Sequence, residues 1–239
     1  MKKLCILFVL LAFAAIPALA DKPDMADVNN AIPIPCGLSC VTWVWDGEFY
    51  TEVCDDQGGG PVWEYGVHAN SEVPQYDCNG EQLGNVLATV LNGDTPNDAG
   101  ERAVLGMFHV DGASYMLEFC HFYDVETSYD GGNVEINDGS GWVVIEPMGG
   151  YPQPEINSST SFYAFCVDGE PGFAGHDPAA FLNDCFDLSD YIGMDVELAV
   201  TFGSDSSVAY PGWYIASIVA GGPVTALDES SWSTIKALY

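Results

Sequence analysis

Side chains that could act as oxygen ligands gather in the segment SYMLEFCHFYDVETSYDGGNVEINDGSGWVVI, which runs from Ser114 to Ile145. Four carboxylate or amide side chains fall within ten positions of it: Asp124, Glu126, Asp130 and Asn133. Calcium takes about six to eight oxygen ligands from carboxylates, carbonyls and water, so this segment has the residue types of a calcium site. Its spacing does not fit an EF-hand loop.

A second oxygen-rich loop, NGDTPND, follows the apolar run 84–91. The two loops together supply the candidate metal ligands, which are Asp94, Asn97, Asp98, Asp124, Glu126 and Asp130. Calcium is the one cofactor that this pattern suggests. The alternative is ordinary turn chemistry, because Asp and Asn are frequent wherever strands reverse direction.

Residues for catalysis are harder to find. No pair at i, i+4 occurs among the four histidines, which are His68, His109, His121 and His176, and the chain has no HExxH motif. His121 follows Cys120 directly, and neighbouring side chains on a strand point to opposite faces, so the two cannot form a nucleophile–base pair. We therefore expect structural histidines. The many carboxylates keep a glycosidase-like site open as an alternative.

Aromatic side chains offer a further kind of site, a platform on which sugar rings stack. The candidates are Trp43, Trp45, Trp63, Tyr65, Trp142, Tyr151 and Tyr210. Large aromatic residues also dominate protein cores. Both roles stay open, because the sequence does not show which face of a strand each residue takes.

The N-terminus has the pattern of a secretory signal peptide over residues 1–20. Lys2 and Lys3 form a positive start, an apolar run covers 6–16, and Ala-Leu-Ala at 18–20 is a small-residue cleavage site. The apolar run is shorter than the roughly 20 residues that span a bilayer, and no later stretch reaches that length. We expect a secreted or cell-surface protein without a transmembrane segment.

Charge is the most extreme global property. Removal of residues 1–20 leaves 35 acidic residues against the basic residues Lys22, Arg102 and Lys236, a net charge of about −32. Lys and Arg make the phosphate contacts of nucleic-acid binding, so nucleic acid is excluded as a partner. Anionic membrane surfaces are disfavoured for the same reason. The acids can serve solubility outside the cell, or divalent cations can neutralise some of them.

Seven of the eight cysteines follow residue 20: Cys36, Cys40, Cys54, Cys78, Cys120, Cys166 and Cys185. An exported chain enters a disulfide-permissive compartment, and an odd number leaves at least one thiol free or paired between molecules. The spacing Cys36-x3-Cys40 favours a disulfide that closes a small loop, with zinc as the alternative. Cys120 lies in a strand pattern, where we expect a buried apolar thiol.

The elements that must position all these residues are short strands. The segment 196–202 alternates most regularly, which predicts an inward face of Val196, Leu198, Val200 and Phe202 and an outward Glu197 and Thr201. Further strands are predicted at 41–50, 62–66, 84–91, 103–108, on both sides of 124–133, and at 142–145, 181–188 and 212–219. Turn residues separate them, and 148–177 is a long loop-like excursion.

This pattern predicts an all-β fold, a two-sheet antiparallel β-sandwich. The tail departs from it, because Trp232, Ile235 and Leu238 lie at helical spacing behind Ser230 and Ser231, which can cap a helix. One short C-terminal helix is therefore predicted.

Several stretches are also familiar in their order along the chain. They are WEYGVHANSEVP, NVLATVLNGDTPNDAGERAV, FCHFYDVETSYDGGNVEI with WVVIEPMGGYP, and FDLSDYIG followed by VTFGSDSSVAYPGWYI. From about Trp63 to Val219 the chain resembles the MAM-like jelly-roll domain of immune inhibitor A-type secreted metalloproteases and of bacterial surface proteins. The resemblance implies a jelly roll that acts as a non-catalytic accessory or adhesion module, often with bound calcium. One departure bears on calcium: after GWYI the family usually carries two aspartates, where this chain has Ala216 and Ser217.

These observations predict a signal peptide at 1–20, a flexible leader at 21–38, a β-jelly-roll domain at 39–221 and a tail with a short helix at 222–239. The function they favour is that of a secreted, non-catalytic binding or adhesion module, calcium-stabilised, for an extracellular glycan or surface protein. The alternative is a secreted hydrolase of glycosidase type with a carboxylate-based site.

Overall fold

The computed structural model describes residues 36, 38, 40–52, 62–112, 114–156, 167–176 and 180–222. The predicted signal peptide, most of the leader, and the tail with its helix lie outside these residues. The described residues form eleven strands and one 3-10 turn, η1 (Ser189–Tyr191). None of their helical segments has the length and apolar character needed to cross a membrane.

Strands were expected over nearly the same segments that form them. The strands are β1 (Cys40–Val44), β2 (Tyr50–Glu52), β3 (Glu64–Gly66), β4 (Val86–Ala88), β5 (Gly100–His109), β6 (Met116–Asp124), β7 (Gly131–Asn137), β8 (Trp142–Ile145), β9 (Leu182–Asp187), β10 (Asp195–Gly203) and β11 (Gly212–Gly222). The predicted strand 41–50 is two strands, β1 and β2, because Gly47 takes a φ of +93° between them and turns the chain.

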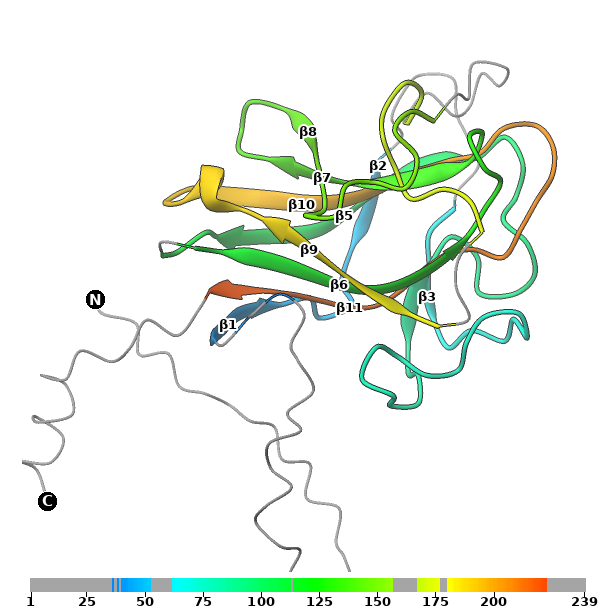
Figure 1. Ribbon diagram of the computed structural model, residues 1–239, viewed down its shortest axis with the longest axis horizontal. Coiled ribbons are helices and arrows are strands. Elements are labelled where there is room, and N and C mark those ends of the chain that lie inside the picture. Colours follow the sequence, from blue (N-terminus) through cyan, green and yellow to red (C-terminus); the bar gives the residue numbers. More distant parts are fainter. Residues whose placement is uncertain are drawn as a thin grey trace, which may run out of the picture.

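The strands form two antiparallel sheets, which lie one above the other in Figure 1. One sheet has the order β3-β4-β11-β6-β9, with β1 beside β4 on the same edge of the long strand β11. The other has the order β2-β5-β10-β7-β8. The pairs β4–β11, β5–β10, β6–β9 and β7–β8 are nested like a long hairpin rolled upon itself, which is the connectivity of a jelly roll. The predicted two-sheet, all-β fold is confirmed for the described residues.

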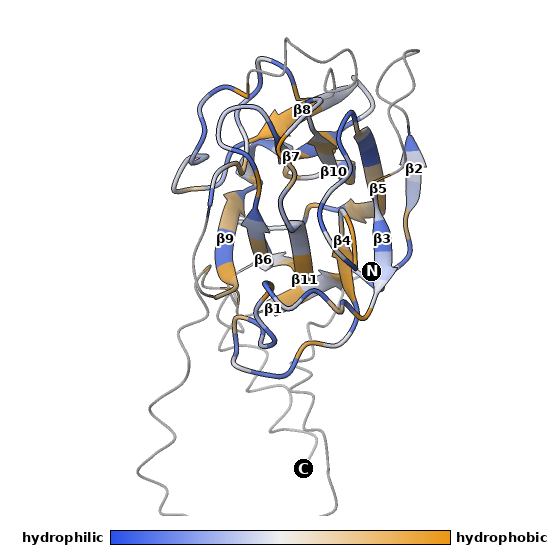
Figure 2. Cartoon of the chain, turned by 90° about the vertical axis from the view of Figure 1, so that its right-hand side faces the viewer, coloured by the Kyte–Doolittle hydropathy of each residue, from blue (hydrophilic) through white to orange (hydrophobic). Residues whose placement is uncertain are grey.

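The hydrophobic core lies between the sheets. The predicted inward face of β10 is confirmed, because Val196, Leu198, Val200 and Phe202 are fully buried in it. Thr201 was predicted outward and is also fully buried, and its hydroxyl is satisfied there because it donates to the Glu135 carboxylate of the neighbouring strand. In Figure 2 strands of both layers carry hydrophobic residues (orange), whereas many connecting loops are hydrophilic (blue).

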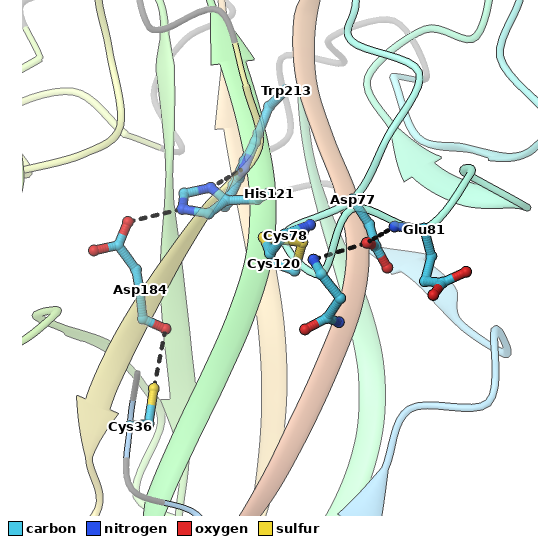
Figure 3. The surroundings of a disulfide bond; sticks show 9 residues. Cys36, Asp77, Cys78, Glu81, Cys120, His121, Asp184 and Trp213 are labelled. Carbon is cyan, nitrogen blue, oxygen red and sulfur yellow. Dashed lines mark hydrogen bonds and ion pairs between the residues drawn. A yellow bond between two sulfur atoms is a disulfide. The ribbon is translucent and has the colours of Figure 1, made fainter. Parts of the chain in front are cut away.

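A second, smaller core covers the outer face of the β3-β4-β11-β6-β9 sheet. Val73 and Phe181 pack there against Phe122 and Tyr214 of the sheet. A disulfide between Cys78 and Cys120 ties the 67–83 segment to β6 (Figure 3). The prediction of a thiol at Cys120 is therefore wrong, although the residue is buried as predicted.

The other disulfide among the described residues joins Cys36 to Cys185 of β9. The predicted disulfide between Cys36 and Cys40, which would have closed a small loop, is therefore wrong. Strand β9 brings Cys185 to a Cα–Cα distance of 5.5 Å from Cys36, which is within the range that a disulfide requires. The sequence separation of 149 residues hides this proximity from sequence reasoning.

Candidate metal centre

Three carboxylates meet at one end of the sandwich: Glu126, Asp130 and Asp205. One oxygen from each lies within 4.8 Å of the others. Asp130 is 2% exposed and Asp205 is 6% exposed, while Glu126 is partly buried. We call these three residues the carboxylate cluster. Such a group of oxygen ligands suits a hard divalent cation.

The pairing of β7 with β10 places two of the three side chains together. The last pair of this register is Gly131 with Gly203, so Asp130 and Asp205 lie just beyond the paired residues on adjacent strands. The backbone N–H of Asp205 donates to Asp130 Oδ1 at 2.8 Å. Glu126 belongs to the same loop as Asp130, and this loop is closed by a bond from the Asp130 N–H to the Glu126 carbonyl.

The long excursion after β8 packs over this loop. Gly132 and Phe173 exchange backbone hydrogen bonds, and the N–H of Val125 donates to the Gly175 carbonyl. The contact is so close that a Cβ on Gly131 would lie 2.7 Å from Ile156 Cδ1. The described parts of the excursion thus bury the surroundings of the cluster, as expected of a packed loop.

Electrostatics leave the cluster short of positive charge. Arg102 is the one Lys or Arg within the described residues, and it pairs with Glu135 and Glu52 instead. Burial raises the pKa of Asp130 to about 7, and the charges of Asp205 and Glu126 add to this effect. Burial also raises the pKa of Glu126, with a contribution from Asp205.

One oxygen of the cluster also lacks a hydrogen-bond partner. Glu126 Oε2 is buried and no described group donates to it. A buried polar atom without a partner costs roughly 1–3 kcal/mol, and more when it is charged. A cation bound to Glu126, Asp130 and Asp205 would provide that partner and would relieve the repulsion among the three carboxylates. The residues therefore fit calcium, with carbonyl groups and water as further ligands.

The cluster contains two of the six predicted ligands, Glu126 and Asp130. Asp124 is instead paired with the His176 ring at 2.6 Å. The other predicted loop lies next to Asp205, because the Asp98 N–H donates to the Asp205 carbonyl at 2.7 Å and the Asn97 amide donates to the Ser206 carbonyl. Asp94 is exposed. Binding of the ion by any of the six remains a prediction.

Asp205 was missed by sequence reasoning. It lies in the turn GSDSS directly after the most regular predicted strand, and only knowledge that β10 pairs with β7 would have placed it beside Asp130. Ala216 packs instead against the second core, and neither it nor Ser217 belongs to the cluster.

Two of the histidines differ in their surroundings. His121 is fully buried and accepts a hydrogen bond from Trp213, while His109 forms an exposed pair with Asp195. Cys120 and His121 do lie on opposite faces of β6, because Cys120 packs in the second core whereas the His121 ring contacts Phe173 in the first.

The candidate sugar-stacking residues have different surroundings from one another. Trp45 and Trp63 are core residues, and Trp43 and Tyr151 pack against the core. Trp142 lies under the Arg102 guanidinium, Tyr210 contacts His176, and Tyr65 is 41% exposed.

The fold and the site define a disulfide-bonded jelly-roll sandwich with a buried carboxylate cluster. No family model matches the chain. Bacillopeptidase F of Bacillus subtilis (strain 168) is 26% identical over 175 residues, which are 73% of this chain and 10% of that protein. The chain thus spans about a tenth of this relative and is similar to one segment of a bacterial peptidase.

Three solved structures show weaker likeness. The K2 adhesin domain of Lys-gingipain has a TM-score of 0.38 and 14% identity, with 72% of this chain and 89% of that one covered. The K1 adhesin domain of Lys-gingipain from Porphyromonas gingivalis W83 has a TM-score of 0.39 and 11% identity. The match covers 73% of this chain and 90% of that one. The Endo-D glycoside hydrolase domain from Streptococcus pneumoniae R6 has a TM-score of 0.36 and 13% identity. The match covers 72% of this chain and 21% of that one.

Proposed function

We propose that the protein is a secreted, non-catalytic binding module of the MAM-like type, which calcium stabilises at Glu126, Asp130 and Asp205. It recognises an extracellular glycan or a surface protein. The observation that carries the proposal is the close approach of three carboxylates, two buried and one partly buried, while the one Lys or Arg among the described residues pairs elsewhere. Two disulfides support an oxidising, extracellular location.

The alternative function, a carboxylate-based hydrolase, has one observation in its favour. A pKa of about 7 for Asp130 would suit a general acid. However, a general acid must reach the glycosidic oxygen, and Asp130 and Asp205 are almost completely buried. Burial of this kind does not hinder coordination of an ion by the carboxylates, so the cluster supports cation binding better than catalysis.

The relative supports an accessory role. Bacillopeptidase F carries a peptidase name, but this chain matches only 10% of it, and no HExxH motif occurs in the sequence. A segment of that size is typical of one domain attached to a larger protein.

Calcium titration of the chelator-treated protein tests the calcium part of the proposal. An ion that binds only the folded state must raise the melting temperature, and it does so more at higher concentration. We expect Glu126→Gln and Asp205→Asn to abolish this rise, whereas Asp94→Asn, at an exposed position, should retain it. An unchanged melting temperature of the wild-type protein would refute calcium binding.

A glycan and surface-protein array on the calcium-loaded protein tests the binding function. Saturable binding without release of reducing ends is expected. Release of reducing ends that is lost in Asp130→Asn would instead establish the hydrolase.

A further inference from the structure

A cavity of about 430 Å³ opens where the chain passes from β1 of one sheet to β2 of the other. Its volume lies in the range of small-ligand sites, which is roughly 300–1,000 Å³. The β1–β2 connection supplies aromatic and acidic side chains, and residues 104–107 of β5 form the opposite wall. The residues that matter here are Trp43, Asp46, Glu48, Phe49 and Tyr50.

Contacts among the lining residues and with their neighbours hold the walls of the cavity in place. The Trp43 ring stacks on Phe108 at a centroid distance of 4.8 Å. The Glu48 carbonyl accepts from the Trp45 indole N–H at 2.7 Å, and the Glu48 N–H donates to Asp46 Oδ1 at 3.0 Å. A turn fixed at three points presents the same side chains to every ligand, which reduces the entropy lost on binding.

The chemistry of the lining favours a cation. Aromatic ring faces attract ammonium and guanidinium groups, and ionised carboxylates only accept hydrogen bonds. No Lys or Arg lines the cavity. Two further carboxylates act nearby, because burial and the charges of Glu197 and Glu52 raise the pKa of Tyr50. A sugar hydroxyl needs donors as well as acceptors, and the lining offers few side-chain donors.

The backbone beside the cavity favours an extended chain as the carrier of that cation. β2 pairs with β5 only at Arg102, Ala103 and Val104. Beyond Val104, residues 105–109 of β5 have no strand on this side among the described residues, whereas β10 pairs with residues 106–109 on the other side, after a bulge at Leu105. An unpaired strand edge binds extended peptides by adding a strand to the sheet.

We propose that this cavity binds the lysine or arginine side chain of an extended peptide segment, which belongs to a partner protein and pairs with the free edge of β5. The inference rests on the proposed binding function and gives the chemistry of the partner. The strongly negative chain, with a formal net charge of −30, attracts basic partners from a distance.

Fluorescence anisotropy with the calcium-loaded, full-length secreted protein tests the inference. The probe is a fluorescently labelled peptide of sequence TVTKTVT. A second labelled peptide, with acetyl-lysine in place of lysine, serves as the uncharged comparison. We expect the acetylated peptide to bind about tenfold more weakly, since it lacks the charge that rings and carboxylates recognise. The Glu48→Gln variant should bind the lysine peptide about three- to tenfold more weakly than the wild-type protein does.

The matched control is Glu81→Gln, which removes the same charge at an exposed position on the 67–83 segment. It should change the affinity less than about twofold, because exposed charges at a distance are screened by salt. Equal losses in the two variants, or equal binding of the two peptides, would overturn the inference. If neither peptide binds while calcium still raises the melting temperature and the array still detects a ligand, this inference fails and the proposed function stands.

Discussion

Trp213 donates its indole N–H to Nδ1 of the fully buried His121 at 2.9 Å. An indole nitrogen can only donate, so Nδ1 carries no proton, and Nε2–H must donate to the Asp184 carboxylate, 2.8 Å away. The bond joins β11 to β6 in the interior of the molecule, on the face of the sheet opposite to the Cys78–Cys120 disulfide (Figure 3). His121 is therefore a neutral structural group that fixes two neighbouring strands.

Replacement of this histidine should destabilise the fold. His121→Phe leaves the buried Trp213 N–H without an acceptor, so we expect the free energy of unfolding to fall by about 2–4 kcal/mol. Urea denaturation in saturating calcium measures it. The control is His109→Phe, which breaks only an exposed pair with Asp195 and should cost less than about 1 kcal/mol. Equal costs in both variants would contradict the structural role of His121.

The carboxylate cluster predicts how stability depends on pH without a cation. The folded pKa of Asp130, about 7, is above its ordinary value of 3.8. Between these values the folded state retains a proton that the unfolded state has lost, so Asp130 makes stability fall as pH rises from about 4 to 7. Urea unfolding in chelator should show a steeper fall for the wild-type protein than for Asp130→Asn.

Saturating calcium should oppose the fall in stability that rising pH causes in chelator. The ion binds the ionised carboxylates, so its stabilising effect should increase through the same pH window. If the stabilisation by calcium is the same at pH 5 and pH 8, the ion binds elsewhere. Asp94→Asn, which leaves the cluster intact, should behave as the wild-type protein does.

Close packing of β7 under Trp213 predicts a large effect from one methyl group. A Cβ on Gly132 would lie 2.6 Å from the Trp213 ring and 2.6 Å from the Thr201 carbonyl oxygen. Because Thr201 is on the paired strand, its backbone cannot move away without loss of the pairing. Gly132→Ala should therefore lower the free energy of unfolding by about 2–3 kcal/mol or more.

Thermal and urea unfolding of Gly149→Ala provide the comparison. No atom lies within 4 Å of the Cβ added there, so the change should stay within about 0.5 kcal/mol. A tolerated Gly132→Ala would mean that β7 and β11 are further apart than described.

The Cys78–Cys120 disulfide should stabilise the second core more than the first. Its removal in a Cys78→Ala, Cys120→Ala double variant should cost about 2–4 kcal/mol, as expected for the loss of a native crosslink. The 67–83 segment should also become sensitive to limited proteolysis, because this crosslink ties it to β6. Unchanged stability and unchanged cleavage would show that hydrophobic contacts alone hold the segment.

Most strands were predictable because their evidence is local. The alternation of Val196, Leu198, Val200 and Phe202 identifies a buried strand face without reference to any other part of the chain. The break between β1 and β2 was not predicted, because aromatic and β-branched residues on both sides of Asp46, Gly47 and Glu48 suggested one continuous strand.

The site was only half predictable because its evidence is not local. Glu126 and Asp130 share one loop, and their proximity follows from the sequence. Asp205 comes 75 residues later, and its place beside Asp130 depends on the β7–β10 register. The same reason explains the disulfides: Cys185 meets Cys36 across 149 residues, whereas sequence reasoning favoured the nearby Cys40.

The pairing of β1 with the end of β11 has a consequence for how this domain can be carried. Cys40 and Gly222 face each other in that register, so the first strand of the sandwich begins beside the end of the last strand. Paired residues on antiparallel strands are about 5 Å apart. A longer polypeptide that carries this domain could therefore connect to its first and last strands from the same side of the sandwich.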